Sequence, residues 1–395
     1  MEVKIDMARV VLKRGEEKRI QAGHPWIFDN EVKEINGEYA PADIVDVCDF
    51  KGNFLGRGFI NPKSKILVRI MTRKQETIDA EFIKKRIKEA WEHRVQYCDP
   101  NSCRVIFGEA DLLPALIVDK FGDYLSIQIL ASGMERWRDT IIEALNEYIK
   151  PLGIYERSDV SVREKEGLEM RKGFIGESFN TIVPMIENDI KMYVDLENGQ
   201  KTGYFLDQKD NRAALKSYSK GKRVLDTFSH TGGFALHAAA YGAKEVTAVD
   251  ISDHAVEFIM KNAALNGFED RIKGVSANVF DYLKECQVNG TKFDTIILDP
   301  PAFAKNKAAM EGATRGYKEI NLRAMKLLSP GGILMTCSCS HYMKTELFIE
   351  VIREAARDAR KVVRQLEFRV QSKDHPVLVG SDESFYLKCL ILQVF

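Results

Sequence analysis

Short apolar runs separated by turn residues occupy the first part of the chain. They lie at residues 8–14, 22–32, 44–50, 54–60 and 66–71, and a Lys51-Gly52-Asn53 turn separates the third from the fourth. Runs of this length, bounded by glycine, proline and asparagine, are typical of β-strands. The pattern predicts a small β-barrel over residues 1–75.

Helical periodicity begins after Thr77. The apolar face of the expected helix consists of Phe82, Ile83, Ile87, Ala90, Trp91 and Val95. Further along, strand-like runs at 115–121, 124–130, 153–157 and 190–195 surround a predicted helix at 134–149. We therefore expect a mixed α+β domain that connects the two ends of the chain and spans residues 76–195.

From about residue 220, strands alternate with helices. Seven strand-like runs lie at 223–228, 245–250, 271–277, 293–299, 331–338, 364–371 and 386–395. Helical stretches between the first five are typical of βαβ units and of a largely parallel, Rossmann-like α/β sheet. The last two runs have no full helix between them, which predicts a closing hairpin. We assign this seven-stranded sheet to residues 196–395 and expect ligands at the carboxyl ends of its strands.

The composition is that of a globular protein with more than one domain. Of 395 residues, 45% are hydrophobic and 29% are charged, which excludes collagen-like and disordered classes. No apolar run approaches the ~18 residues of a membrane span, and the N-terminus lacks the features of a signal peptide. The seven cysteines are scattered without a Cys-x-x-Cys pair. We expect a reducing cytoplasm, no membrane partner and no metal.

The formal net charge of zero conceals an uneven distribution. Residues 1–75 carry 14 Lys and Arg against 11 Asp and Glu, residues 76–195 carry 16 against 23, and residues 196–395 carry 28 against 24. A mildly basic head and tail therefore flank an acidic middle. Excesses of this size are as typical of solvated faces as of nucleic-acid binding.

Two acids end consecutive strands of the predicted sheet. Asp226 precedes a turn that contains Thr231-Gly232-Gly233, and Asp250 ends the next strand. A carboxylate at the second position can accept hydrogen bonds from two ribose hydroxyls, whereas Asp226 would repel a pyrophosphate. The pair favours a cationic or zwitterionic ligand such as S-adenosylmethionine. The alternative role for each acid is capping of the helix that follows it.

Asn278 and Phe280 follow the third strand of this sheet. An amide there can hydrogen-bond an adenine edge, and an aromatic ring can pack on the adenine face. A polar helix start followed by one core phenylalanine explains the two residues equally well.

Candidate reactive groups follow the fourth and fifth strands. Asp299 precedes two prolines that fix the backbone, which is a rigid way to hold a planar base. The alternative is a turn that the prolines impose. Cys337 lies within the fifth strand, where a buried thiol is usually inert, whereas Cys339 lies just past the strand. A reactive thiolate is therefore expected at Cys339, and Cys337 is expected to be a packing residue.

Several segments together resemble a known family. They are 23–28 (Gly-His-Pro-Trp-Ile-Phe), the twelve residues 201–212, the turn 226–234, 299–303 (Asp-Pro-Pro-Ala-Phe), 315–318 (Arg-Gly-Tyr-Lys) and 338–340 (Ser-Cys-Ser). The C-terminal half resembles class I S-adenosylmethionine-dependent methyltransferases. The whole chain is similar to ribosomal RNA cytosine-5 methyltransferases, of the large-subunit methyltransferase I type, in which a PUA domain and a connecting domain precede the catalytic domain.

The resemblance implies a set of site residues. It makes Cys339 the catalytic cysteine and places Asp226 and Asp250 at the cofactor, with Asn278 near its adenine. Asp299, from its place at the end of the fourth strand, is expected to steady the base. The cofactor-binding set that we expect is Gln208, Asp226, Phe228, Gly232, Asp250, Ile251, Asn278 and Phe280. Two positions depart from the family pattern: many relatives have Asp where this chain has Asn278, and Ala302 stands where another branch carries a second cysteine.

The resemblance also implies a reaction. Carbon 5 of cytosine is a poor nucleophile, so a thiolate must add at carbon 6 before methyl transfer from S-adenosylmethionine. Ribosomal RNA, 23S of the large subunit, is the expected partner, and a homodimer is left open. One alternative is methylation of an exocyclic amine, to which an acid-Pro-Pro-aromatic motif points. Another is a non-catalytic RNA-binding assembly factor that retains cofactor binding.

Overall fold

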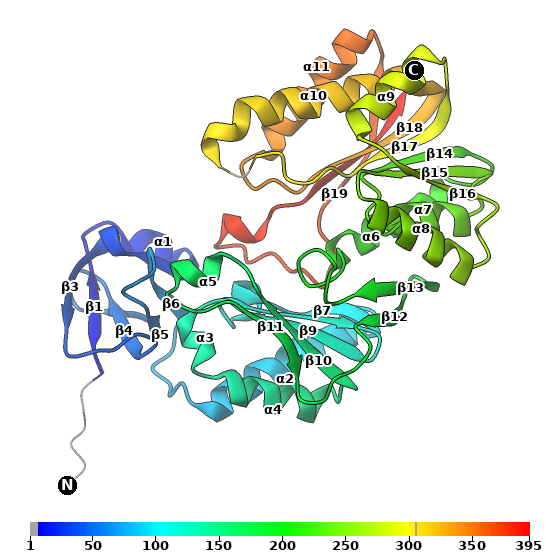
Figure 1. The fold of residues 1–395 in the computed structure, drawn as a ribbon. Coiled ribbons are helices and arrows are strands. Elements are labelled where there is room, and N and C mark those ends of the chain that lie inside the picture. Colours follow the sequence, from blue (N-terminus) through cyan, green and yellow to red (C-terminus); the bar gives the residue numbers. More distant parts are fainter. Residues whose placement is uncertain (1–6, 305) are drawn as a thin grey trace. The chain divides into compact units, whose positions relative to one another are not determined.

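A computed structural model describes residues 7–304 and 306–395 (Figure 1). The chain forms two compact units. The first unit comprises residues 1–185, 194–206 and 373–384, and the second comprises 186–193, 207–372 and 385–395. The domain boundaries expected at residues 75 and 195 remain a prediction.

The first unit begins with the predicted β domain. Its six-stranded sheet has the order β2-β6-β5-β4-β1-β3. The strands are β1 (Arg9–Leu12), β2 (Trp26–Phe28), β3 (Val32–Asn36), β4 (Ile44–Cys48), β5 (Phe54–Ile60) and β6 (Ile66–Thr72), and the short helix α1 spans Glu17–Gln21. Val10, Ile27, Val47 and Val68 are fully buried in one core. Gly58 is required because a Cβ there would lie 1.9 Å from the Arg69 carbonyl oxygen.

A five-stranded sheet of order β11-β10-β9-β8-β7 follows in the first unit. Its strands are β7 (Ser102–Phe107), β8 (Leu116–Phe121), β9 (Tyr124–Ile129), β10 (Gly153–Ser158) and β11 (Arg171–Ile175). The helices are α2 (Ala80–Tyr97), α3 (Ser132–Glu135), α4 (Arg138–Tyr148) and α5 (Val162–Lys165). Asp79 caps α2 by accepting a hydrogen bond from the Phe82 amide. Ile83 and Ile87 of α2 lie in a second core with Ile141 and Leu145 of α4.

A two-stranded sheet, β12 (Ile182–Glu187) with β13 (Ile190–Asp195), precedes the large sheet of the second unit. The large sheet has seven strands in the order β16-β15-β14-β17-β18-β20-β19, which confirms the predicted α/β class. The strands are β14 (Arg223–Thr227), β15 (Glu245–Asp250), β16 (Ile272–Ser276), β17 (Phe293–Leu298), β18 (Leu328–Ser338), β19 (Val363–Arg369) and β20 (Lys388–Val394).

Strand β20 lies between β18 and β19 and runs antiparallel to both. The expected hairpin is therefore present as a strand pair, but its connection is not a short turn. Residues 370–387 separate the two strands, and 373–384 of them belong to the first unit. The lack of a full helix between the last two runs correctly predicted that β19 and β20 pair. It wrongly predicted that a short turn joins them.

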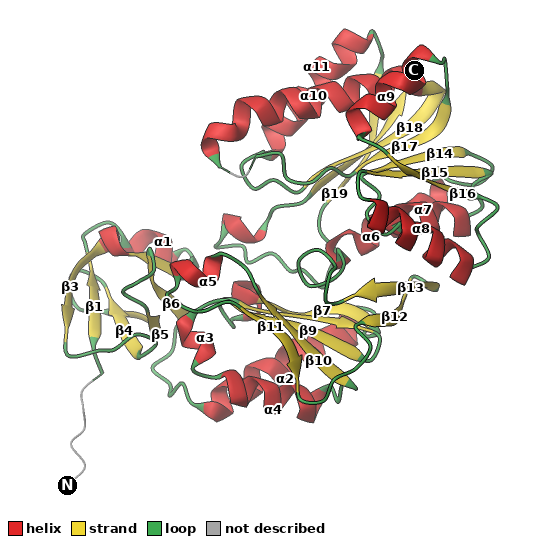
Figure 2. Ribbon diagram, viewed as in Figure 1, coloured by secondary structure: helices red, strands yellow, loops and turns green. Residues whose placement is uncertain are grey.

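Helices cover both faces of the seven-stranded sheet (Figure 2). One group comprises α9 (Val279–Val288), α10 (Met310–Leu327) and α11 (Thr345–Ala359), and the other comprises α6 (Lys209–Ala214), α7 (Gly233–Ala240) and α8 (Asp253–Leu265). Strand β14 pairs with β15 on one side and β17 on the other, so the strand order reverses beside it. Open α/β sheets bind ligands at the carboxyl ends of strands around such a point. Every helix in the described ranges is too short or too polar to span a bilayer.

Candidate active site

Asp226 lies in β14 near its carboxyl end and is fully buried. One carboxylate oxygen, Oδ2, accepts hydrogen bonds from the Ser229 hydroxyl and from the Ala235 amide, 3.0 Å away in the first turn of α7. The other oxygen, Oδ1, has no hydrogen-bond partner among the described residues. Burial, with the nearby charges of Asp299 and Asp250, raises the pKa of Asp226 to about 7. The side chain thus binds the helix end and still offers an unused acceptor.

The turn after β14 has unusual backbone geometry. Phe228 and His230 have positive φ angles of 57° and 51°, and Gly232, the N-cap of α7, has φ of 90°. Side-chain-bearing residues rarely adopt this left-handed conformation, and such strain is concentrated at functional sites. Gly232 also lies close to α8, where an added Cβ would be 3.3 Å from Ile259. The glycine therefore satisfies both the backbone angle and the close approach.

Asp250 ends β15 and is tied to the same turn. Its carboxylate accepts hydrogen bonds from the His230 amide at 2.9 Å and from the Ser252 amide at 3.0 Å. The cap of α8 is Ser252, whose hydroxyl accepts from the Ala255 amide, so Asp250 does not cap that helix. Ile251, next in the chain, is 70% exposed. A carboxylate held by two amides keeps lone pairs for a ligand at this edge.

Asn278 follows β16 and caps helix α9. Its side-chain oxygen accepts a hydrogen bond from the Phe280 amide at 2.9 Å. The helix-start interpretation of the sequence is therefore correct for this side chain, and its amide NH₂ group remains a donor.

Three aromatic rings line up beside these acids. The Phe303 ring lies 6.3 Å from Phe228 and 6.1 Å from Phe280, measured between centroids. Tyr317 of α10 also packs against Phe303, with 4.8 Å between the ring centroids. Phe228, Phe280 and Phe303 are half-buried, and half-buried rings of this kind suit a flat, partly apolar ligand.

Asp299 follows β17 and is oriented by a chain of amides. Gln208 Nε2 donates to Asp299 Oδ1 at 2.8 Å, and Asn211 Nδ2 donates to Gln208 Oε1 at 2.7 Å. Arg369 Nε in turn donates to Asn211 Oδ1 at 3.0 Å. Each donor fixes the orientation of the next amide. The structure thus places Gln208, expected at the cofactor, against Asp299.

Cys339 directly follows the last residue of β18, Ser338. Its Sγ atom lies 3.9 Å from the carbonyl oxygen of Pro300, in the proline turn after Asp299, and the residue is partly exposed. Cys337 is buried within β18 and pairs in register with Cys389 of β20. Burial raises the pKa of the Cys337 thiol well above its usual range, so this thiol is held in its unreactive form.

Two buried polar residues at this edge had no role in the sequence prediction. The Tyr317 hydroxyl accepts a hydrogen bond from the Ser338 hydroxyl at 3.1 Å. Lys388 of β20 is 2% exposed, and its Nζ donates to the Ser340 carbonyl oxygen at 2.8 Å. The signal for Lys388 was available, because it is the one charged residue in the apolar run 387–392.

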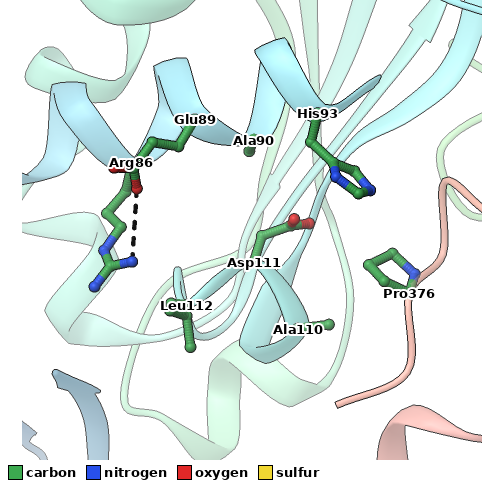
Figure 3. A pocket seen from close by; sticks show the side chains of 8 residues that line it. All are labelled: Arg86, Glu89, Ala90, His93, Ala110, Asp111, Leu112 and Pro376. Carbon is green, nitrogen blue, oxygen red and sulfur yellow. Dashed lines mark ion pairs between the residues drawn. The ribbon is translucent and has the colours of Figure 1, made fainter. Parts of the chain in front are cut away.

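A pocket of about 220 Å³ lies elsewhere, in the first unit, between α2 and the 3-10 turn Gly108–Asp111 (Figure 3). It is lined by Arg86, Glu89, Ala90, His93, Ala110, Asp111, Leu112 and Pro376. Arg86 is paired with Glu89, and Asp111 is held by the buried Arg94. Glu89 and Asp111, the acids of this pocket, are therefore both in ion pairs. The described residues contain no cluster of His, Cys, Asp and Glu suited to a metal.

The seven-stranded α/β sheet, with acids at the ends of β14 and β15, belongs to the class of S-adenosylmethionine-dependent methyltransferases. The family model described as S-adenosylmethionine-dependent methyltransferase matches residues 169–392, and that of a PUA-like domain matches residues 10–73. The first match covers more than half of the chain, and the second covers the six-stranded sheet.

Two relatives illustrate the narrower family. Ribosomal RNA large subunit methyltransferase I of Klebsiella pneumoniae (strain 342) is 42% identical over 96% of this chain and 96% of its own. The protein of that name from Shewanella frigidimarina is 43% identical over 98% of this chain and 99% of its own. The chain belongs to the ribosomal RNA large subunit methyltransferase I family.

Solved structures share the fold along the whole chain. A methyltransferase from Streptococcus mutans superposes with a TM-score of 0.83 at 22% identity, covering 98% of this chain and all of its own. The methyltransferase SMU.776, solved in complex with SAH, gives a TM-score of 0.85 at 22% identity and the same coverage.

Proposed function

We propose that this enzyme methylates ribosomal RNA of the large subunit at carbon 5 of a cytosine, with Cys339 as the nucleophile. The relatives carry the large-subunit RNA in their names. The observation that carries the cytosine-5 assignment is the partly exposed thiol of Cys339 beside the turn that follows Asp299. Transfer to an amine nitrogen, which has its own lone pair, would not need this thiol.

The described residues fit S-adenosylmethionine. The unpartnered Asp226 Oδ1 offers an acceptor for the ammonium group of the cofactor, and Asp250 offers acceptors for its ribose hydroxyls. Gly232 keeps the backbone open to the ligand, and Ile251, Asn278 and the rings of Phe228 and Phe280 would surround the adenine. When bound, the cofactor supplies an electrophilic methyl group on its sulfonium.

Asp299 and Cys339 act on the base. Asp299, oriented by Gln208, accepts a hydrogen bond from the exocyclic amine of cytosine or from a protonated ring nitrogen. The Cys339 thiolate adds to carbon 6, and the displaced electron pair makes carbon 5 nucleophilic enough to take a methyl group. The carbon-5 proton then passes to solvent, and its electron pair forms the double bond to carbon 6 as the bond between Sγ and carbon 6 breaks and the thiolate leaves.

The test is trapping of the covalent intermediate. Ribosomal RNA containing 5-fluorocytosine has no carbon-5 proton to lose, so the wild-type enzyme should remain linked to it. Cys339→Ala should abolish both the adduct and methylation while its affinity for S-adenosylhomocysteine, measured by calorimetry, stays near the wild-type value.

Cys337→Ala is the matched control, because it removes a buried thiol two residues away. It should lose some stability and keep most activity. Methylation by Cys339→Ala would overturn the mechanism and favour transfer to an exocyclic amine, for which Asp299 before two prolines and Phe303 is the supporting motif. An adduct that depends on Cys337 would move the nucleophile to that residue.

RNA binding by the PUA-like domain is part of the same proposal. In the turns that follow β1 and β4, the Arg14 guanidinium lies 5.7 Å and the Lys51 ammonium 5.5 Å from the ring centre of Phe50. Cations close to a partly exposed aromatic ring suit phosphates and a stacked base. A cytoplasmic location and a homodimer stay predictions from the sequence.

A further inference from the structure

Lys388 is an unusual residue for a buried strand position. It begins β20 opposite Ser338, the last residue of β18, and is 2% exposed. Its ammonium group donates to two carbonyl oxygens at 2.8 Å, those of Ser340 and Tyr386. Among the ion pairs of the described residues, none gives Lys388 a carboxylate partner. A lysine is rarely buried in this way without a functional reason.

The contact with Ser340 ties this lysine to the segment that carries the proposed nucleophile. Ser340 directly follows Cys339, and its hydroxyl donates to the Ala304 carbonyl oxygen at 3.0 Å. Ser340, on the carboxyl side of Cys339, is thus held in two places: Lys388 of β20 donates to its carbonyl oxygen, and its hydroxyl donates to the segment after β17. Two of the three ammonium hydrogens are used by carbonyl oxygens, and the positive charge is left without a countercharge.

The charge of Lys388 and the thiol of Cys339 are coupled. Burial lowers the pKa of Lys388 to about 8, while the nearby Cys339 acts in the opposite direction and raises it. The ammonium form therefore still predominates at neutral pH. Because the attraction between two charges is mutual, the same ammonium group favours the thiolate form of Cys339.

We infer that Lys388 is a positioning residue for Cys339, which holds the segment after β18 and supplies the positive charge that favours the reactive thiolate. The inference rests on the proposed function, since it assumes that Cys339 acts as a nucleophile. The thiol proton passes to solvent, and Lys388 keeps its own proton.

Other groups around the thiol do not supply this charge. Asp299 is an acid, and burial raises the pKa of Tyr317 and of Cys337 so that both stay neutral. Cys389 beside Cys337 is buried, and Lys344, further along the segment, is exposed to solvent that screens its charge. His341 and Tyr342 lie on the same segment and are the other titratable side chains there.

The experiment measures the pH dependence of iodoacetamide alkylation at Cys339, followed by mass spectrometry of the peptide that contains it. The wild type is compared with Lys388→Met and Lys388→Arg. In Lys388→Met the midpoint of the alkylation profile should rise by about one pH unit or more. Lys388→Arg retains the charge, so its midpoint should stay closer to the wild-type value. Methylation by Lys388→Met should show the same alkaline shift of its pH profile.

Lys344→Met is the matched control, because it removes the same charge from the exposed side of the segment. It should shift the midpoint far less than Lys388→Met. Calorimetry with S-adenosylhomocysteine reports whether each variant is folded. If Lys388→Met does not fold, the comparison passes to Lys388→Arg and Lys388→Gln, of which only the second loses the charge.

An unchanged alkylation profile in a folded variant that lacks the charge would overturn the role of Lys388 and leave the proposed function intact. Methylation by Cys339→Ala would overturn the proposed function. The shift in Cys339 alkylation between the wild type and Lys388→Met would be unaffected by that result. The two failures are therefore distinguishable.

Discussion

The buried carboxyl of Asp226 affects both the stability of the fold and the proposed binding of the cofactor. Its pKa in the fold, about 7, lies above the usual value of 3.8 because burial disfavours the charge. The contribution of this group to stability is therefore full below about pH 4 and is lost as the pH rises through about 7. The proposed ammonium ligand needs the ionised form, so stability and cofactor binding have opposite pH dependence at this residue.

Asp226→Asn should separate the two effects. Without cofactor, we expect the variant to gain stability relative to the wild type between pH 4 and pH 8, by up to about 4 kcal/mol, because no charge has to be buried. Its affinity for S-adenosylhomocysteine should fall and lose its dependence on pH. Urea unfolding and calorimetry across this pH range measure both quantities.

Asp253→Asn, which changes an exposed acid at the start of α8, is the control and should leave both pH profiles unchanged. Unaltered cofactor affinity in Asp226→Asn would remove Asp226 from the cofactor site.

At the scale of elements, helix α6 and the turn before it are coupled to the end of β17. Gln208, at the N-cap of α6, donates to Asp299, and Asn211 within the helix fixes the orientation of the Gln208 amide. The family-like segment 201–212 thus has a physical role that its sequence did not show. It orients an acid that lies more than ninety residues further along the chain.

Gln208→Leu should lower the rate of methylation about tenfold to a hundredfold, because Asp299 loses the donor that orients it. Cofactor affinity should change little, so kcat falls while calorimetry with S-adenosylhomocysteine stays near the wild-type value. Gln365→Leu, at an exposed position of β19, is the matched control. A large loss of cofactor affinity in Gln208→Leu would return this residue to the cofactor-binding set.

Arg94 of α2 performs a comparable task in the first unit. This arginine is fully buried. It donates two hydrogen bonds to the Asp111 carboxylate and one to the backbone oxygen of Asp374, at 2.9 Å. Asp374 belongs to the segment 373–384, which lies between β19 and β20 in sequence. One arginine thus ties a distant segment to α2 in the same unit.

Arg94→Met should lower the free energy of unfolding by about 3–5 kcal/mol, since it leaves the Asp111 carboxylate without its cation. Arg86→Met, which breaks the more exposed pair with Glu89 at the pocket of Figure 3, should cost no more than about 0.5 kcal/mol. Urea denaturation measures both. Equal losses of unfolding free energy in the two variants would show that burial of the ion pair does not determine its contribution to stability.

At the scale of the whole molecule, charge is distributed unevenly. The chain is neutral overall, yet its first 75 residues carry a net charge of +3 and the next 120 a net charge of −7. Binding to phosphates depends on such local excess more than on net charge. The cluster of Arg14, Phe50 and Lys51 is the place in the PUA-like domain where we expect it to act.

Reversing both charges, in Arg14→Glu with Lys51→Glu, should weaken binding of ribosomal RNA and reduce the slope of its salt dependence by about 2. The double variant Lys85→Glu with Lys88→Glu changes the net charge equally on the exposed face of α2 and should have a smaller effect. Filter binding at several salt concentrations makes the comparison. Equal effects of the two variants would show that only overall charge matters.

Substitution is a better test of this domain than truncation at residue 75. Phe59 of the six-stranded sheet packs against Gly133, where an added Cβ would lie 2.0 Å from the ring, and belongs to the core of the five-stranded sheet. Deleting the first sheet would therefore uncover that core and confuse loss of RNA contacts with loss of stability.

The sequence by itself determined the periodic elements and the α/β class. Alternating strands and helices, and acids at the ends of runs that became β14 and β15, depend on neighbours within about ten residues, so local pattern reveals them. The end of β18 between Cys337 and Cys339 was also visible, because the apolar run stops there.

Only the tertiary structure decided which distant groups meet. The donor from Gln208 to Asp299, the anchoring of Lys388 on Ser340 and the path of residues 373–384 into the first unit all join positions far apart in sequence. Hydrophobic periodicity specifies which face of an element is buried but not which polar group it meets there. That choice follows from strand order, since β20 inserts between β18 and β19 and brings Lys388 beside the segment of Cys339.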